Sequence, residues 1–201
     1  LEADARAIAE KHRDIRRAGG AGRRIFALPA FGPALDRAHE HLASRHQDDS
    51  TLRKPAEWFL DNYYIVRRVA RQVAHDLPRG FVRRLPELTS GPEEGEPRIG
   101  ALARALVAKT GIELDRATLR RFVDSYQAVT PLTIAELWAL PTMLRASVLS
   151  GLLSFFDELH VPMDGPRSGV RPSSPRLQNS PVLAPGAGAE VPCGHGPRAR
   201  D

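Results

Sequence analysis

The alternation of apolar and polar residues along this chain predicts helices from its first residues onward. Residues 2–18 form an amphipathic pattern that ends at a Gly-Gly pair, as helices commonly do. After a proline-containing loop, residues 34–45 repeat the pattern, and the polar run 47–54 then predicts a hinge. The first quarter of the chain is therefore expected to hold two helices joined by loops.

The clearest helical pattern covers residues 56–77. Its apolar positions are spaced alternately by four and three residues, which places them on one face of a helix. They are Phe59, Tyr63, Val66, Ala70, Val73 and Leu77. Pro78 should end this helix and Gly80 should let the chain turn.

The pattern predicts further helices in the second half of the chain, over residues 99–109, 116–128 and 134–159. Asp115 is a suitable N-cap for the second of these. Thr133 and Glu136 have the spacing of a capping box at the start of the third, in which Pro141 should cause a bend or break. No segment alternates with a period of two, so we expect an all-α, multi-helix, bundle-like fold without a sheet.

The composition divides the chain into three parts. We expect an N-terminal helical pair over residues 1–50, a helical domain over 51–160, and a disordered tail over 161–201. The tail is rich in Pro, Gly, Ser and Arg and poor in apolar residues, so it cannot repay the entropy of ordering. Out-of-frame GC-rich DNA has this composition, which suggests a truncated product with a frameshifted tail.

Charge and cysteine content narrow the classes of function. The 201 residues carry a net charge of +5 and have a pI near 10.0, but the arginines are interspersed with Asp and Glu along the helices. Interleaved charge is typical of solvated helix faces rather than of a nucleic-acid surface, so no nucleic-acid partner is expected. The single cysteine, Cys193, allows no internal disulfide and fits a reducing cytoplasm.

One apolar segment, residues 134–156, is long enough to suggest a membrane span. Glu136, Pro141 and Arg145 interrupt it, and each central charge costs roughly 2.5–3.5 kcal/mol on insertion. We therefore expect a buried, kinked helix and no membrane span in this chain.

Several polar residues stand inside apolar helical patterns. Asn62 falls within the apolar stripe of its helix, where a buried amide should fix a neighbouring helix or loop, or else contact a ligand. Asp61 and Tyr64 point to the opposite side and should be solvated or meet a partner. The sequence thus separates a core face from a possible contact face on one helix.

A second polar set surrounds Pro141. It consists of Gln127, Glu136, Trp138 and Arg145. Trp beside carboxylate and guanidinium groups can form a carbohydrate platform, because an aromatic face stacks on sugar while charged groups hold hydroxyls. The same residues can equally fasten helices together in the interior.

Free-standing catalytic and metal motifs are not recognisable. His39 and His46 share a helix face but lie two turns apart, which is too far for chelation without a third element. The glycine-rich segment 17–23 lacks the Gly-Lys-Ser/Thr of a phosphate loop. We therefore assign no catalytic residue, no metal ligand and no cofactor-binding residue to this chain.

A set of ordered motifs resembles the N-terminal region of cyclic β-1,2-glucan synthases over roughly residues 1–155. The motifs are Ala9-Glu-Lys-His12, Trp58-Phe-Leu-Asp-Asn-Tyr-Tyr-Ile-Val66, Asp76-Leu-Pro-Arg-Gly80, Leu85-Pro-Glu-Leu88, Pro97-Arg98, Tyr126-Gln127 and Pro131-Leu-Thr-Ile-Ala-Glu-Leu-Trp-Ala-Leu-Pro-Thr-Met-Leu-Arg145. No single motif is decisive, but their order and spacing together are fairly specific.

The resemblance implies a helical, non-catalytic scaffold on the cytoplasmic side of a bacterial inner-membrane glycosyltransferase. Such enzymes polymerise glucose from UDP-glucose, with a divalent metal, and then cyclise the glucan. The transferase core, as a missing part or as intact copies of the enzyme, would be the partner. Candidate structural or interaction residues are Trp58, Asp61, Asn62, Tyr63, Arg79, Gly80, Arg98, Tyr126, Gln127, Glu136, Trp138, Pro141 and Arg145.

Other functions remain open at this point. The chain could be a stand-alone helical protein–protein interaction module that uses the face of Asp61 and Tyr64 or the region of Trp138. A weak nucleic-acid binder ranks third. A tyrosine that primes a protein-linked glucan is also conceivable, with Tyr63, Tyr64 and Tyr126 as candidates.

Overall fold

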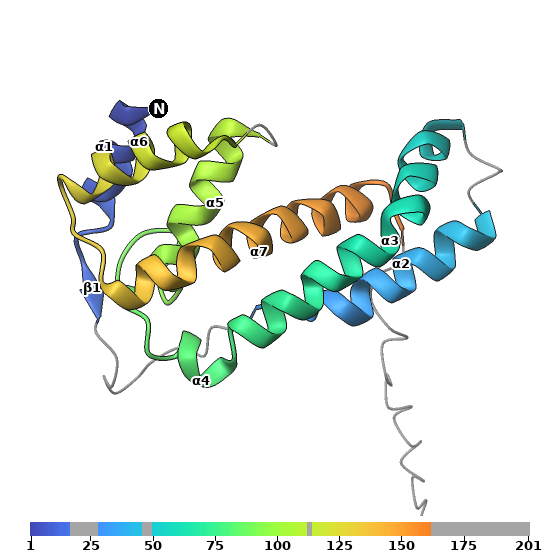
Figure 1. Cartoon of the computed structure of the whole chain (residues 1–201), viewed down its shortest axis with the longest axis horizontal. Coiled ribbons are helices and arrows are strands. Elements are labelled where there is room, and N and C mark those ends of the chain that lie inside the picture. Colours follow the sequence, from blue (N-terminus) through green and yellow to red (C-terminus); the bar gives the residue numbers. More distant parts are fainter. Residues whose placement is uncertain (17–27, 46–49, 112–113, 162–201) are drawn as a thin grey trace, which may run out of the picture. The chain divides into compact units, whose positions relative to one another are not determined.

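The fold is built from helices, with one small β-ribbon (Figure 1). The computed structural model describes residues 1–16, 28–45, 50–111 and 114–161, with only the backbone described at 45 and 50–53. The elements are α1 (Glu2–Lys11), β1 (Ile15–Arg16), α2 (Phe31–Arg45), α3 (Ser50–Asp76), α4 (Arg79–Val82), β2 (Glu87–Leu88), α5 (Arg98–Thr110), α6 (Arg116–Gln127) and α7 (Ile134–Glu158). The predicted all-α class is confirmed. The tail was predicted from residue 161, but Val161 is buried, and residues 162–201 lie outside the described residues.

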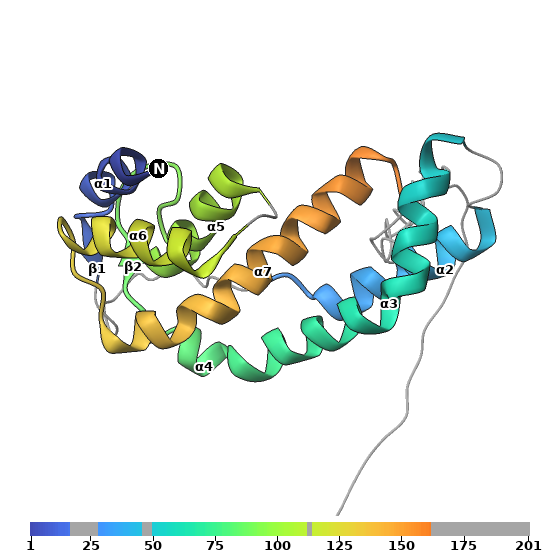
Figure 2. The same ribbon diagram turned by 45° about the horizontal axis from the view of Figure 1, so that its top comes forward.

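Helix α7 is the element around which the others pack. It lies between α5 on one side and α3 on the other and also contacts α2, which packs against α3 (Figures 1 and 2). Helix α1 packs against α6. All described residues belong to one compact unit. The division predicted at residue 50 stays a prediction.

Aromatic side chains join α3 to α7. The Phe59 ring is fully buried and meets the Phe156 ring edge-on, with centroids 4.7 Å apart. Tyr63, one turn further along α3, packs on Phe59 with its ring centroid 5.9 Å away. The apolar stripe predicted for residues 56–77 is thus the core face of α3.

The predicted helix starts at Asp115 and Thr133 are confirmed. The Asp115 carboxylate accepts a hydrogen bond from the backbone N–H of Thr118 at 2.7 Å, which caps α6. At the start of α7, Thr133 and Glu136 form a complete capping box. Both caps satisfy backbone donors that a helix leaves unpaired at its first turn.

The expectation of no sheet is wrong. Helix α1 ends at Lys11 rather than residue 18, and β1 pairs antiparallel with β2, with Ile15 opposite Leu88. An ion pair of 3.3 Å between Arg16 and the buried Glu87 accompanies the second pair of residues. Strands of two residues are too short to show alternation, and this pairing depends on contacts between distant parts of the chain.

Two prolines are tolerated where the sequence predicted interruptions. Helix α3 begins at Ser50, so part of the predicted hinge is helical and Pro55 lies within the helix, while residues 46–49 lie outside the described residues. Helix α7 runs past Pro141 without ending. Pro141 removes the hydrogen bond to the carbonyl of Leu137, but both residues are exposed, so water can satisfy that carbonyl.

Among the described helices, α7 has the length and composition of a membrane span, with a mean hydropathy of 1.4 over its most apolar window. Of that window, 44% is buried inside the fold. Its contacts with α5 and α3 account for the apolar residues on its inner side.

Candidate functional site

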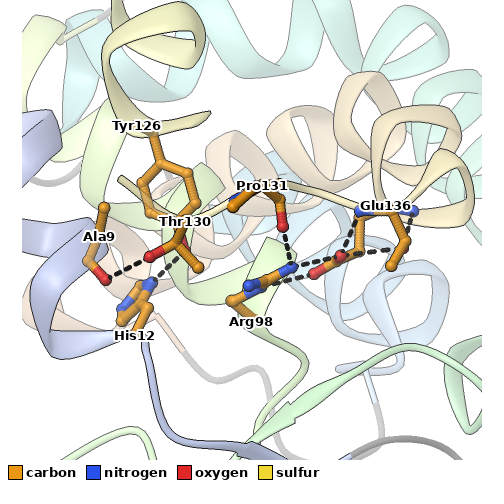
Figure 3. Close-up of polar contacts among 8 residues, drawn as sticks. Ala9, His12, Arg98, Tyr126, Thr130, Pro131 and Glu136 are labelled. Carbon is orange, nitrogen blue, oxygen red and sulfur yellow. Dashed lines mark hydrogen bonds and ion pairs between the residues drawn. The ribbon is translucent and has the colours of Figure 1, made fainter. Parts of the chain in front are cut away.

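A buried ion pair between Arg98 and Glu136 lies at the centre of the candidate site (Figure 3). Arg98 Nε donates to Glu136 Oε1 at 2.8 Å, and Arg98 Nη2 donates to Glu136 Oε2 at 2.6 Å. Nη2 also donates to the carbonyl oxygen of Pro131 at 3.0 Å. Only 1% of the Arg98 side chain and none of the Glu136 side chain is exposed, so the pair is shielded from solvent.

The segment before α5 fixes the position of Arg98. Arg98 is the first residue of α5, and its N–H donates to the carbonyl of Pro86 at 2.9 Å. A bridge between Glu87 and Pro97 closes the intervening loop next to that bond. The Leu85–Leu88 and Pro97–Arg98 motifs, which are separated in sequence, therefore form one local structure.

Glu136 has two tasks at the start of α7. Its Oε2 accepts hydrogen bonds from the Thr133 backbone N–H at 2.8 Å and from Thr133 Oγ1 at 2.9 Å. The same carboxylate binds Arg98 through both of its oxygens. One side chain therefore caps α7 and fastens it to α5.

A second group of polar contacts ties the end of α1 to the turn between α6 and α7 (Figure 3). His12 Nδ1 lies 3.1 Å from the hydroxyl oxygen of the fully buried Tyr126. Thr130 Oγ1 donates to the carbonyl of Ala9 at 3.0 Å. Together with the ion pair, these contacts form a buried polar cluster that connects α1, α5, α6 and α7.

Burial sets the protonation states in the cluster. It lowers the pKa of His12 and raises the pKa of Tyr126 well above its usual range, so both side chains are neutral near pH 7. Burial also opposes the charge of Arg98, but the hydrogen bonds and charge of Glu136 outweigh it and raise the pKa of Arg98. The cluster therefore pairs one charged couple with one neutral couple, and its described contacts are those of an internal clamp.

The depressed pKa of His12 predicts a pH-dependent stability. Because the folded pKa lies below the unfolded value of 6.5, the unfolded chain takes up a proton first as the pH falls. The contribution of His12 is thus fully present above about pH 6.5 and is lost below it, by at most about 1.4 kcal/mol per pH unit. Chemical denaturation of the wild type and of His12→Gln between pH 7.5 and 5 should give a steeper loss for the wild type. Parallel curves would contradict the prediction.

The structure brings some of the predicted site residues together and separates others. Arg98, Tyr126 and Glu136 share the buried polar cluster, and Gln127, next to Tyr126, is half-buried. Trp138 is 79% exposed, because two residues turn a helix by about 200° and place it opposite Glu136. Gln127, Glu136, Trp138 and Arg145 therefore do not form one carbohydrate platform.

On α7, the other two predicted residues lie on the exposed side with Trp138. Pro141 and Arg145 are both exposed. At the end of α3, Arg79 and Gly80 are exposed at the start of α4, and a Cβ added to Gly80 would meet no atom within 4 Å. Their proposed roles in interaction stay predictions.

On α3, Asn62 does not fix a neighbouring helix. Its amide donates to the carbonyl of Trp58, within its own helix, at 2.8 Å. The expectation was wrong because Asn62 lies at the edge of the apolar stripe, half-buried, where its own helix supplies the acceptor. Trp58 is 56% exposed and Asp61 is exposed, on the outer side of α3.

Sequence reasoning missed a cluster that joins α2 to α3. The Tyr63 hydroxyl donates to Asp36, and Arg67 donates to the two Asp36 oxygens at 2.6 and 3.1 Å. Burial works against the Asp36 charge, but the hydrogen bonds from Tyr63 and Arg67 lower its pKa nevertheless. The available signal was the four-residue spacing of Tyr63 and Arg67, which places both side chains on one face of α3.

Comparisons with known proteins show what this sequence is similar to. The chain is 33% identical to the cyclic beta-(1,2)-glucan synthase NdvB of Rhizobium meliloti (strain 1021) over 154 residues, 69% of this chain. No protein-family model matches the chain. The resemblance predicted from the motifs is confirmed: this is a helical protein related to glucan synthases. The chain spans 5% of the length of that relative.

In the part of the chain that the structure describes, no group of three or more His, Cys, Asp or Glu side chains is placed to hold a metal ion. Arg98 instead binds Glu136 and the carbonyl of Pro131, and His12 lies in hydrogen-bond distance of Tyr126. The contacts of the described cluster hold the helices together.

Proposed function

We propose that this chain is the non-catalytic, N-terminal helical scaffold of a cyclic β-1,2-glucan synthase-like glycosyltransferase. The observation that carries the proposal is the 33% identity to NdvB, which runs over 69% of this chain. The transferase core of the enzyme would polymerise glucose from UDP-glucose with a divalent metal, beside this scaffold, at the cytoplasmic side of the inner membrane.

The positions of the resembling motifs support a scaffolding role. Motifs that are scattered along the sequence meet at the buried polar cluster, where Arg98, Glu136 and Tyr126 make their contacts. Residues held for chemistry usually line an accessible site, whereas these are buried among helices. Their burial is better explained by the need to hold α1, α5, α6 and α7 in one arrangement.

A chimeric synthase tests this proposal. In NdvB, the segment that matches this chain would be deleted in one version and replaced by residues 1–161 of this chain in another. Membranes from bacteria lacking their own synthase would be supplied with labelled UDP-glucose, and cyclic glucan would be measured alongside the amount of synthase. We expect the deletion to lower the amount of cyclic glucan made per amount of synthase by more than tenfold. The replacement should restore most of that synthesis.

Two outcomes would contradict the proposal. Full glucan synthesis by the deleted enzyme would show that the segment is not a needed scaffold. Transfer of glucose from UDP-glucose by this chain alone, with any divalent metal, would show that it is not a non-catalytic part. An inactive replacement with normal synthase levels would also count against the proposed role.

A stand-alone helical protein–protein interaction module is the second candidate. It is favoured by the large exposed side chains of Trp58, Tyr64 and Trp138, which are 56, 68 and 79% exposed. It differs from the first proposal in its partner, which would be a protein other than the synthase. If the replacement enzyme makes glucan and the enzyme with the deletion does not, the second candidate is excluded.

A further inference from the structure

Helix α7 carries an apolar stripe on its outward side. The members of the stripe are spaced alternately by four and three residues, and they are Ile134, Trp138, Pro141, Arg145, Val148, Leu152 and Phe155. Of these, Leu152 is partly buried against the core. Ile134 is 75% exposed and Trp138 is 79% exposed, although both are large apolar side chains. At about 1.5 Å per residue the stripe is roughly 32 Å long. We call it, with the partly exposed Leu137, the α7 outer face.

The outer side of α3 borders this face. The charge of Arg145 contributes, after hydrogen bonds from His75 and Gln72, to the lowered pKa of Asp76 at the end of α3. Helices α3 and α7 also pack against each other, with the Phe59 ring of α3 on the Phe156 ring of α7.

The exposed apolar area of this face is large for a single helix. A fully exposed aromatic side chain offers about 150–250 Å². The exposed fractions of Ile134, Leu137, Trp138, Val148 and Phe155 correspond to on the order of 550 Å². The largest apolar patch on a typical monomer is about 300–600 Å² and is often functional.

The spacing allows a second helix to cover the α7 outer face. Alternate intervals of three and four residues keep a stripe in register with a second helix over several turns, because the side chains of one fit the holes of the other. A helix that lies on a lipid surface has the same period, so the charges around the stripe must distinguish the two partners. The regular stripe runs from Ile134 to Phe155, while the inner side of α7 is occupied by α5 and α3.

Arg145 determines the chemistry of the partner. It is the only formal charge in the stripe, and within the described ranges of the chain it forms no hydrogen bond or ion pair. The carboxylate of Asp76, which the charge of Arg145 influences, is already bonded to His75 and Gln72. Covering an unpaired guanidinium is costly unless the partner supplies a carboxylate, so the covering helix should carry an acidic residue at that level.

The position of Arg145 argues against a second copy of this chain. It lies at the middle of the stripe, between Ile134 and Phe155. If two α7 outer faces met about a two-fold axis, in either direction, the two Arg145 side chains would face each other. An anionic membrane is also disfavoured, because the carboxylate of Asp76 borders the α7 outer face near Arg145.

We propose that the α7 outer face docks an apolar α-helix of the remaining part of the synthase, one that carries a carboxylate opposite Arg145. The proposal rests on the proposed function for the identity of the partner, because this chain corresponds to only 5% of the length of NdvB. The chemistry of the docked helix rests on the stripe and on Arg145 alone.

Synthetic peptides test that chemistry directly. The probes are two fluorescent 21-residue helical peptides with Leu at heptad positions a and d, which differ only in Glu or Lys at the central a position. They are used at nanomolar concentration so that they stay monomeric, and binding to this chain is followed by anisotropy. We expect the Glu peptide to bind at least tenfold more tightly, Arg145→Glu to reverse the preference, and Trp138→Glu to weaken both peptides by at least tenfold.

Ser154→Glu is the matched control, since Ser154 is exposed on α7 but lies away from the stripe. It should bind both peptides as the wild type does. Circular dichroism and thermal melting verify that each variant is folded, which is expected because the changed side chains are exposed. Equal binding of the two peptides, or a preference that Arg145→Glu leaves unchanged, would overturn the proposal. So would a dimer that Trp138→Glu disrupts in sedimentation, or Trp138-dependent binding to anionic vesicles.

The chimeric synthase separates the failure of this inference from failure of the proposed function. If the replacement enzyme makes glucan and Trp138→Glu within it lowers synthesis at least tenfold while Ser154→Glu does not, both proposals are supported. If Trp138→Glu has no effect on an active replacement, the docking proposal fails and the scaffold stands. If the unaltered replacement is inactive, the scaffold fails, and the peptides still decide what the face binds.

Discussion

Replacing Arg98 with methionine is expected to lower the free energy of unfolding by about 3–5 kcal/mol. The substitution fills much of the same space but leaves Glu136 buried without its positive partner, and it frees the carbonyl of Pro131. Because the carboxylate is shielded from water, it cannot regain that interaction from solvent. Urea denaturation followed by circular dichroism measures the loss.

Two companion variants show whether the buried charge is the cause. The double variant Arg98→Met/Glu136→Gln removes both charges, while the amide oxygen of the introduced glutamine can still accept a hydrogen bond from Thr133, so it should be more stable than Arg98→Met alone. Arg120→Met breaks an exposed ion pair with Asp124 within α6 and should cost less than about 1 kcal/mol. A loss as small for Arg98→Met as for Arg120→Met would refute the clamp.

Phe59→Ala is expected to destabilise the fold by about 3–5 kcal/mol. The ring is completely buried between α2, α3 and α7 and packs on Phe156 at 4.7 Å and on Tyr63 at 5.9 Å. Removing the ring leaves a cavity, because the surrounding helices can move only partly into the space, and two aromatic contacts are lost. The change in denaturation midpoint at constant slope gives the value.

Phe155→Ala is the matched control for this prediction. Phe155 neighbours Phe156 in sequence but is 40% exposed, so its removal should cost much less. If the two variants lose equal stability, the aromatic contact between α3 and α7 is not what holds these helices together. A large loss for Phe59→Ala alone would place that contact among the main determinants of the fold.

The sequence predicted those features that depend on local chemistry. The N-cap at Asp115 and the capping box of Thr133 and Glu136 are set within four residues, and both occur as expected. The stripe from Phe59 to Leu77 likewise follows from helical periodicity alone. In each case the physical cause lies in the segment itself, so no knowledge of the rest of the chain was needed.

The features that escaped prediction depend on contacts between distant segments. The pairing of β1 with β2 shortens α1, and the sequence near residue 12 contains no signal for the end of a helix. The motifs showed that Arg98 and Glu136 matter, but not that they bind each other across 38 residues. Asp36 gave no sign that it would bind Tyr63 and Arg67, because its partners belong to another helix.

The attachment of α1 has a consequence for the order in which the chain folds. Its contacts reach far along the sequence, since the residue numbers of His12 and Tyr126 differ by 114 and those of Ala9 and Thr130 by 121. Contacts of such separation form late, because the intervening chain must first be closed into a loop. Helices α3, α5 and α7 can assemble before α1 docks. We therefore expect the N-terminal helix to exchange its amide hydrogens sooner than α7, as the last element to join the fold and the first to leave it.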